Sequence, residues 1–117
     1  MFKKQYRLPR GTEFNKKDFY TSPFFVLKLT RNEESFSRFG FVVSKKIDKR
    51  ATVRNKIKRK IRVCIETNFD KIKPGYDILF ILKKHILNKT TKEISELTLG
   101  ELEKQKLLIW KKLFYFL

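Results

Sequence analysis

The feature that most constrains the fold is the segment from Lys45 to Arg62, which is densely basic and also regularly apolar. Ten of its side chains are basic, and Asp48 is its one acid. Apolar residues recur at helical spacing, which predicts a helix over roughly Thr52 to Phe69 with one buried face. Thr52 is the predicted N-cap. The apolar positions are Val53, Ile57, Ile61, Cys64 and Ile65.

Runs typical of β-strands lie on both sides of this helix. Phe24 to Thr30, Arg38 to Lys45 and Tyr76 to Lys83 are rich in β-branched and aromatic residues. A polar break at Asn32 to Ser35 predicts that the first two strands pair as a hairpin. The order strand, helix, strand forms a βαβ unit, so we expect the second and third strands to be parallel.

The chain length and composition predict one domain. A chain of 117 residues, 41% of them apolar, supports a single compact core. We expect an α+β fold of two layers, in which the basic helix packs on a small sheet. A head (1–22) precedes the core (23–84), and a helical segment (90–117) follows. The last helix is predicted from about Thr91 into the 110s, with a kink or break at Gly100. The apolar tail after residue 106 is short and split by two lysines, so we expect it to cover the core and not to enter a membrane.

The charge balance restricts the partners. There are 29 Lys and Arg against 12 Asp and Glu, a net charge of +17. Such a chain attracts polyanions, with nucleic acid favoured over an anionic membrane surface. No acid occurs from residue 49 to 65, which favours a polyanion-binding face over a solvated face of mixed charge. The predicted RNA-binding residues are Lys45, Lys46, Lys49, Arg50, Arg54, Asn55, Lys56, Lys58, Arg59 and Arg62.

Residues that could support chemistry in the protein itself are scarce. Cys64 is the one cysteine, so no internal disulfide forms, and we expect a reducing cytoplasm. The N-terminal residues lack a signal-peptide pattern. His85 is the one histidine and has no metal-binding partners nearby in sequence. We therefore predict neither catalytic residues nor a metal site in the protein.

The sequence GFVVSKKIDKRATVRNKIKRKIR resembles the signature of the bacterial ribonuclease P protein component. That family has a glycine-led strand ending in Ser-Lys-Lys, a short loop, and a helix with the pattern Arg-Asn-Arg-x-Lys-Arg-x-x-Arg. Here the helix pattern begins at Arg54 and ends at Arg62, with Lys56 in place of the middle arginine and Val63 where an acid or amide often follows. SPFFVLKL and PGYDILFILKK are similar to the family's first and third strands.

The resemblance implies the protein subunit of an endoribonuclease whose RNA subunit performs the chemistry with Mg²⁺. The protein, a monomer by itself, would bind the catalytic RNA through the basic helix and the preceding loop. A cleft beside the sheet would hold the single-stranded 5′ leader of precursor tRNA, and the βαβ crossover would be left-handed where the general rule gives a right-handed one. The expected cleft residues are Phe14, Phe25, Lys28 and Phe41.

Two alternatives remain open from the residues alone. Phe14, Phe25 and Phe41 could pack in the core, because strand aromatics usually face inward. A ribosomal or other structural RNA-binding protein would share the size, the charge and the basic helix. A DNA-binding module is disfavoured because no helix-turn-helix pattern is present.

Overall fold

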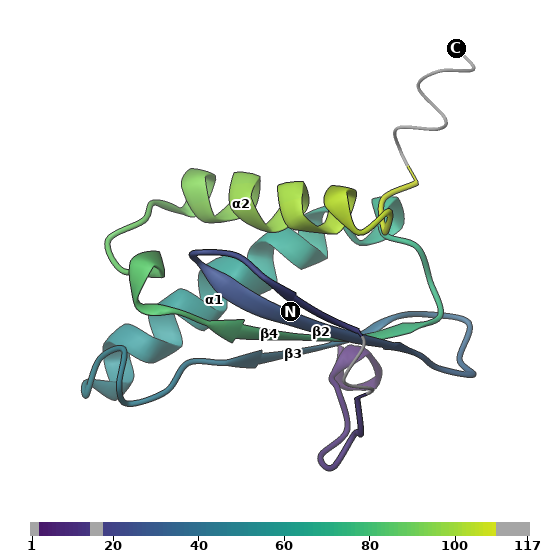
Figure 1. The fold of residues 1–117 in the computed structure, drawn as a ribbon, viewed down its shortest axis with the longest axis horizontal. Helices are drawn as coiled ribbons and strands as arrows, with labels where there is room; N and C mark the ends of the chain where they lie inside the picture. The colour runs from purple at the N-terminus through teal and green to yellow at the C-terminus, as the bar shows by residue number, and fades with distance from the viewer. Residues whose placement is uncertain (1–2, 15–17, 110–117) are drawn as a thin grey trace.

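The computed structural model describes residues 3–14 and 18–109. Its four-stranded sheet has the order β1-β2-β4-β3. Two helices, α1 and α2, cover one face of this sheet, and the head lies on the other side (Figure 1). This arrangement confirms the predicted α+β fold with a helical layer on a small mixed sheet. The strands and helices are β1 (Phe19–Thr21), β2 (Phe25–Arg31), β3 (Arg38–Val42), α1 (Ala51–Thr67), β4 (Tyr76–Leu82) and α2 (Thr91–Lys104).

The last strand in sequence, β4, lies inside the sheet. It pairs antiparallel with β2 and parallel with β3. The parallel prediction is confirmed, and the predicted hairpin between β2 and β3 is wrong. None of the β4 residues is exposed, as expected of a strand with neighbours on both sides. The chain after β2 does not turn back to pair with β3. It is hydrogen-bonded to the residues before β4, because the Asn32 N–H donates to the Gly75 carbonyl at 2.9 Å.

An ion pair fixes the start of β3 against β4. The Arg38 guanidinium donates to both carboxylate oxygens of Asp77, each at 2.8 Å, and the Asp77 side chain is 4% exposed. Asp77 also accepts a hydrogen bond from the Asn32 amide at 2.8 Å. The hydrogen bond to Asp77 raises the pKa of Arg38, so this guanidinium remains charged. The three side chains together hold the end of β2 and the starts of β3 and β4 to one another.

Helix α1 follows its predicted pattern closely. Ile57, Ile61, Cys64 and Ile65 are buried against the sheet. The helix begins one residue earlier than predicted, with Arg50 at the N-cap position and no side-chain cap, so the prediction of Thr52 as N-cap is wrong. Thr52 is exposed within the first turn. The helix ends where the Asn68 amide donates to the Cys64 carbonyl at 2.8 Å.

The head covers the outer edge of β3. A 3₁₀ turn, Lys4–Tyr6, leads into a parallel bridge between Arg7 and Phe39. The Leu8 N–H donates to the Phe39 carbonyl at 2.9 Å. A Cβ atom at Gly40 would lie 3.2 Å from the Leu8 Cβ and 3.0 Å from its Cδ2, so the absence of a side chain at Gly40 lets the head approach the strand.

The C-terminal segment also differs from the prediction. Helix α2 continues through Gly100 and ends at Lys104, where the chain turns at Lys106 with a φ of 60°. The following residues run beside the segment after α1, since the Ile109 N–H donates to the Lys71 carbonyl at 2.8 Å. The predicted continuation into the 110s lies outside the described residues.

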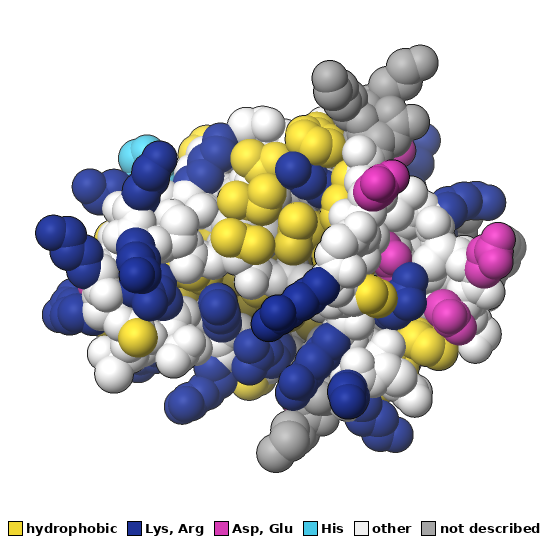
Figure 2. Space-filling view, turned by 90° about the horizontal axis from the view of Figure 1, so that it is seen from below, with side chains coloured by type: hydrophobic (Ala, Val, Ile, Leu, Met, Phe, Trp, Pro, Cys, Tyr) yellow, Lys and Arg dark blue, Asp and Glu magenta, His cyan; other side chains and the backbone are white. Residues whose placement is uncertain are grey.

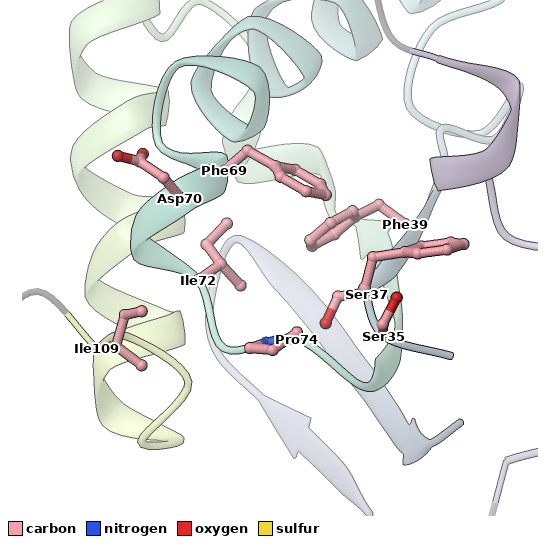
Figure 3. Close-up of a pocket in the computed structure, with 9 residues that line it drawn as sticks. Ser35, Ser37, Phe39, Phe69, Asp70, Ile72, Pro74 and Ile109 are labelled. Atoms are coloured by element: carbon pink, nitrogen blue, oxygen red, sulfur yellow. The ribbon is translucent and has the colours of Figure 1, made fainter. Parts of the chain in front are cut away.

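An apolar hollow lies at this end of the sheet (Figure 3). Phe39 and Phe69 point toward one another, with ring centroids 5.9 Å apart, and Ile72 and Ile109 are among the other lining residues. Its one charged lining residue is Asp70. An acid beside apolar walls does not suit an RNA phosphate, so this hollow is not a candidate for RNA binding.

Helix α2 begins with a reciprocal cap that gives a testable stability effect. The Glu93 N–H donates to the Thr90 hydroxyl at 3.1 Å, and the Thr90 N–H donates to the Glu93 carboxylate at 3.0 Å. We expect Thr90→Ala to lower the free energy of unfolding by about 1 kcal/mol in urea titrations, because one helix N–H loses its partner. Thr90→Ser keeps the hydroxyl and should unfold like the parent; equal losses in both variants would contradict the assigned cap.

Candidate RNA interface

The loop between β3 and α1 presents basic side chains on a fixed backbone. Val43 and Ile47 are buried, at 6% and 7% exposure. Lys45 and Lys46 lie between these two buried residues and Lys49 follows them, and all three lysines are exposed. The Ile47 N–H donates to the Ser44 carbonyl at 3.1 Å, which closes a turn. The loop therefore holds three ammonium groups outward without needing side-chain partners for them.

Two of the predicted RNA-binding arginines help to build this loop. The Arg50 guanidinium donates to both oxygens of Asp48, at 3.0 and 2.8 Å, and lowers the pKa of that carboxyl to about 2. Arg54 donates to the carbonyls of Asp48 and Lys49, at 3.0 and 2.7 Å. Both side chains thus hold the loop against the first turn of α1. Both guanidinium groups keep their positive charge, but some of their N–H donors already bind oxygen atoms of the loop.

The remaining predicted residues lie along the outer surface of α1. Asn55, Lys56, Arg59 and Arg62 are exposed, and Lys58 is half-buried. At 100° per residue these side chains surround the solvent-facing part of the helix. The structure therefore brings all ten predicted RNA-binding residues onto one continuous loop-and-helix surface. We call this surface, residues 45–62, the basic ridge.

The sheet face away from the helices is the second candidate surface. Figure 2 shows an apolar patch on this face with Lys and Arg side chains around it. Strand alternation and register place five apolar residues on this face. We call them, together with Lys28, the open sheet face. The apolar members are Phe19, Val26, Val42, Leu79 and Ile81.

Two of the predicted cleft residues lie on the wrong side of the sheet. Phe25 is 1% exposed and packs edge-on against Phe80, with ring centroids 5.5 Å apart. Phe41 is half-buried and stacks on the same ring at 5.8 Å. Their assignment to a cleft with Lys28 is therefore wrong, because odd and even positions of a strand face opposite ways. The alternative of core packing holds for both.

The other two predicted cleft residues, Phe14 and Lys28, lie in different parts of the structure. Phe14 is half-buried and lies outside the described helices and strands. Lys28 does lie on the open sheet face, directly paired with Phe19 of β1. Its ammonium is 4.3 Å from the centroid of the Phe19 ring, a cation–π distance.

Phe19 is a candidate site residue that the sequence pattern did not indicate. It is 39% exposed, which is unusual for so large an apolar side chain. An exposed aromatic beside a cation is what an unpaired nucleotide needs for stacking. The available signal was its position before a Pro-containing turn, which could have indicated a short strand pairing back onto β2.

Neither a metal centre nor a membrane span is found in the part of the chain that the structure describes. Residues 3–14 and 18–109 contain no group of three His, Cys, Asp or Glu side chains placed to hold an ion. Helices of the length and apolar character needed to cross a membrane are also absent from these residues. His85 is exposed, and burial raises the pKa of the Cys64 thiol.

Comparisons with known proteins agree on one family. The family model described as Ribonuclease P matches residues 2–107. The ribonuclease P protein component of Clostridioides difficile is 38% identical over 78 residues, covering 66% of this chain and 68% of the relative. That of Geobacillus kaustophilus is 33% identical, covering 87% and 88%. The solved RNase P protein of Staphylococcus aureus has 30% identity and a TM-score of 0.71, covering 78% of this chain and 83% of that one. This chain belongs to the ribonuclease P protein family of bacteria.

Proposed function

We propose that this ribonuclease P protein holds the catalytic RNA on its basic ridge and the 5′ leader of precursor tRNA on its open sheet face. Ribonuclease P removes that leader by phosphodiester hydrolysis, which leaves a 5′ phosphate on the mature tRNA. The RNA subunit performs the hydrolysis, and the protein is its accessory subunit. The observation that carries the proposal is the presence of two surfaces of different character on opposite sides of one small sheet.

The basic ridge suits a folded RNA. Most of its basic side chains are exposed, and its one acid, Asp48, is paired with Arg50. The buried stripe of α1 fixes the direction in which the helical part of the ridge faces. Lysine and arginine on such a surface displace counterions from closely spaced phosphates. Asn55 lies among them and has an amide that both donates and accepts, as a base edge or ribose hydroxyl requires.

The open sheet face suits a single strand. Unpaired nucleotides bind where apolar or aromatic platforms are bordered by positive charge. Phe19 and Val42 are 39% and 42% exposed, and Lys28 stands beside Phe19. The ring can stack on a base while the ammonium neutralises the adjoining phosphate. Leader binding then raises substrate affinity without any protein group entering the chemistry.

Three further features belong to this proposal. Mg²⁺ is held mainly by the RNA subunit, with the protein improving metal affinity by positioning the substrate. The protein by itself is a monomer. It works in the cytoplasm, where precursor tRNA is processed.

Cleavage of a precursor tRNA tests the proposal directly. A bacterial ribonuclease P RNA should release the 5′ leader at low Mg²⁺ markedly faster when this protein is added. Because base–aromatic stacking is worth about 1–3 kcal/mol per base, Phe19→Ala should weaken binding of leader-bearing precursor by roughly tenfold. Binding of leaderless mature tRNA to the same holoenzyme should not change.

A matched control uses an exposed apolar residue elsewhere. Val63 is 46% exposed on α1, so Val63→Ala should leave leader-dependent binding as in the parent. Tight RNA binding with no stimulation of cleavage would refute the proposed role. Equal loss for leader-bearing and leaderless tRNA would show that Phe19 does not contact the leader.

A further inference from the structure

A third surface lies between the head, the edge of β3 and the flank of α1. This hollow shares Lys58 and Arg62 with the basic ridge and adds to them residues of the head and of β3. Three cations line it and no acid does. The lining residues are Arg7, Leu8, Phe39, Gly40, Phe41, Lys58 and Arg62.

The backbone holds Arg7 firmly at this hollow. Arg7 bridges Phe39 of β3, and its own N–H donates to the Lys4 carbonyl at 3.1 Å. The residue before it, Tyr6, packs on Phe69 with ring centroids 4.4 Å apart. The residue after it, Leu8, lies close against Gly40. Arg7 therefore stands on an anchored strap, so little backbone entropy is lost when its side chain binds a ligand.

The helix provides the other two cations. Lys58 and Arg62 are four residues apart, so they lie one above the other on the flank of α1. The buried stripe at Ile57, Ile61 and Ile65 fixes which way this flank faces. The hollow thus has one basic wall from the helix and another from the head, with the β3 edge between them.

The three cations have no anionic partner within the described residues. Arg7, Lys58 and Arg62 form no ion pair or side-chain hydrogen bond with another described side chain or backbone group. Arg50, Arg54 and Lys60 differ, since each already donates to a carboxylate or a carbonyl. Like charges in one hollow repel, and a bound anion would relieve that repulsion.

We infer that Arg7, Lys58 and Arg62 form one phosphate-binding site, and that it takes a backbone phosphate of the catalytic RNA. Arginine forks bind phosphate oxygens in pairs, and lysine adds a point charge. The catalytic RNA is the favoured source because two of the three cations continue the basic ridge. The head then belongs to the RNA interface as well as to the sheet. This inference rests on the proposed function of the ridge.

Two head arginines allow a matched test. Arg7→Gln keeps the backbone bridge and removes one charge, and Arg10→Gln removes one charge three residues away, outside the hollow. One phosphate contact is worth roughly five- to eightfold at about 0.1 M salt relative to 1 M. Arg7→Gln should therefore weaken binding to bacterial ribonuclease P RNA by about that factor and reduce the log–log salt slope by about 0.7–0.9. Arg10→Gln should change affinity less than about twofold, as an exposed charge at a distance does.

The double variant tests whether the cations share a phosphate. Arg7→Gln with Arg62→Gln should weaken binding by less than the product of the two single effects. A full product would mean separate phosphates and would overturn the shared site. Equal behaviour of Arg7→Gln and Arg10→Gln would also overturn it. If Arg62→Gln still weakened binding, the proposed ridge would stand; if no variant did, the ridge would fail too.

The source of the phosphate is settled by a second titration. Leader-bearing precursor tRNA is bound to holoenzyme preassembled at saturating protein, with the parent and with Arg7→Gln. The affinity for precursor should be the same in both. A loss confined to this step, with normal binding of the catalytic RNA, would assign the hollow to the leader and refute the inference.

Discussion

Replacing both Lys58 and Arg62 with glutamate is expected to lower the affinity for ribonuclease P RNA by roughly 30- to 100-fold at about 0.1 M salt. Losing the phosphate that the two side chains share accounts for roughly five- to eightfold. The two new carboxylates then repel that phosphate and its neighbours along the RNA, which accounts for the rest. Both positions face solvent or the hollow and not the core, so the helix should remain folded. Filter binding over a range of salt concentrations measures the effect.

The control is an equal change of charge on the other helix. Lys92 and Lys104 are exposed on α2, away from the basic ridge and the hollow. Glutamate at both changes the net charge by the same amount and should lower affinity by less than about tenfold, through the general field alone. Similar losses in the two double variants would show that binding depends on net charge and not on a defined surface. Circular dichroism should show native helix content in both.

Phe80→Ala should lower the free energy of unfolding by roughly 4 kcal/mol. Phe80 is 0% exposed at the middle of β4, and its ring contacts those of Phe25 and Phe41. Alanine leaves a cavity between the sheet and the helices that neighbouring rings cannot fill without leaving their own contacts. Small domains are stable by only about 5–15 kcal/mol, so this one change removes a large part of the total.

Urea titration with and without the catalytic RNA measures this effect. Phe80→Leu keeps most of the volume and should cost less than half as much. RNA bound to the native state should recover part of the loss, because a ligand of the folded protein stabilises it by mass action. A loss below about 1 kcal/mol for Phe80→Ala would contradict the packing described for the centre of the sheet.

Much of the fold was predictable because local patterns determined it. The stripe from Ile57 to Ile65 predicts both α1 and its buried side, and the order of elements predicts the parallel pairing of β3 with β4. The antiparallel partner of β2 was not predictable in the same way. A polar break after a strand looks the same whether the chain turns back at once or crosses to another neighbour. The hydrogen bonds from Asn32 to Gly75 and Asp77 decide this point, and they join residues more than 40 positions apart.

For the same reason, one part of the candidate site could be predicted from the sequence and the other could not. Charge density alone identified the basic ridge, since exposed side chains of one sign require no knowledge of tertiary contacts. The cleft residues depended on which face of the sheet each strand residue occupies. Phe25 and Lys28 are three positions apart and must face opposite ways in a regular strand. Phe19 was missed because its place beside Lys28 depends on the register of β1, which only the folded sheet defines.

The inner position of β4 has a consequence for how the chain folds during synthesis. Both of its neighbours, β2 and β3, leave the ribosome before it does, and β2 waits about fifty residues for its partner. Until residue 82 is made, β3 has no neighbouring strand and β2 has only the short strand β1, whereas α1 can already form. Folding therefore depends on late, long-range pairing, which slows it and exposes apolar surface in the meantime. In that state the nascent chain would expose the basic side chains of α1 before the sheet that orients this helix has formed.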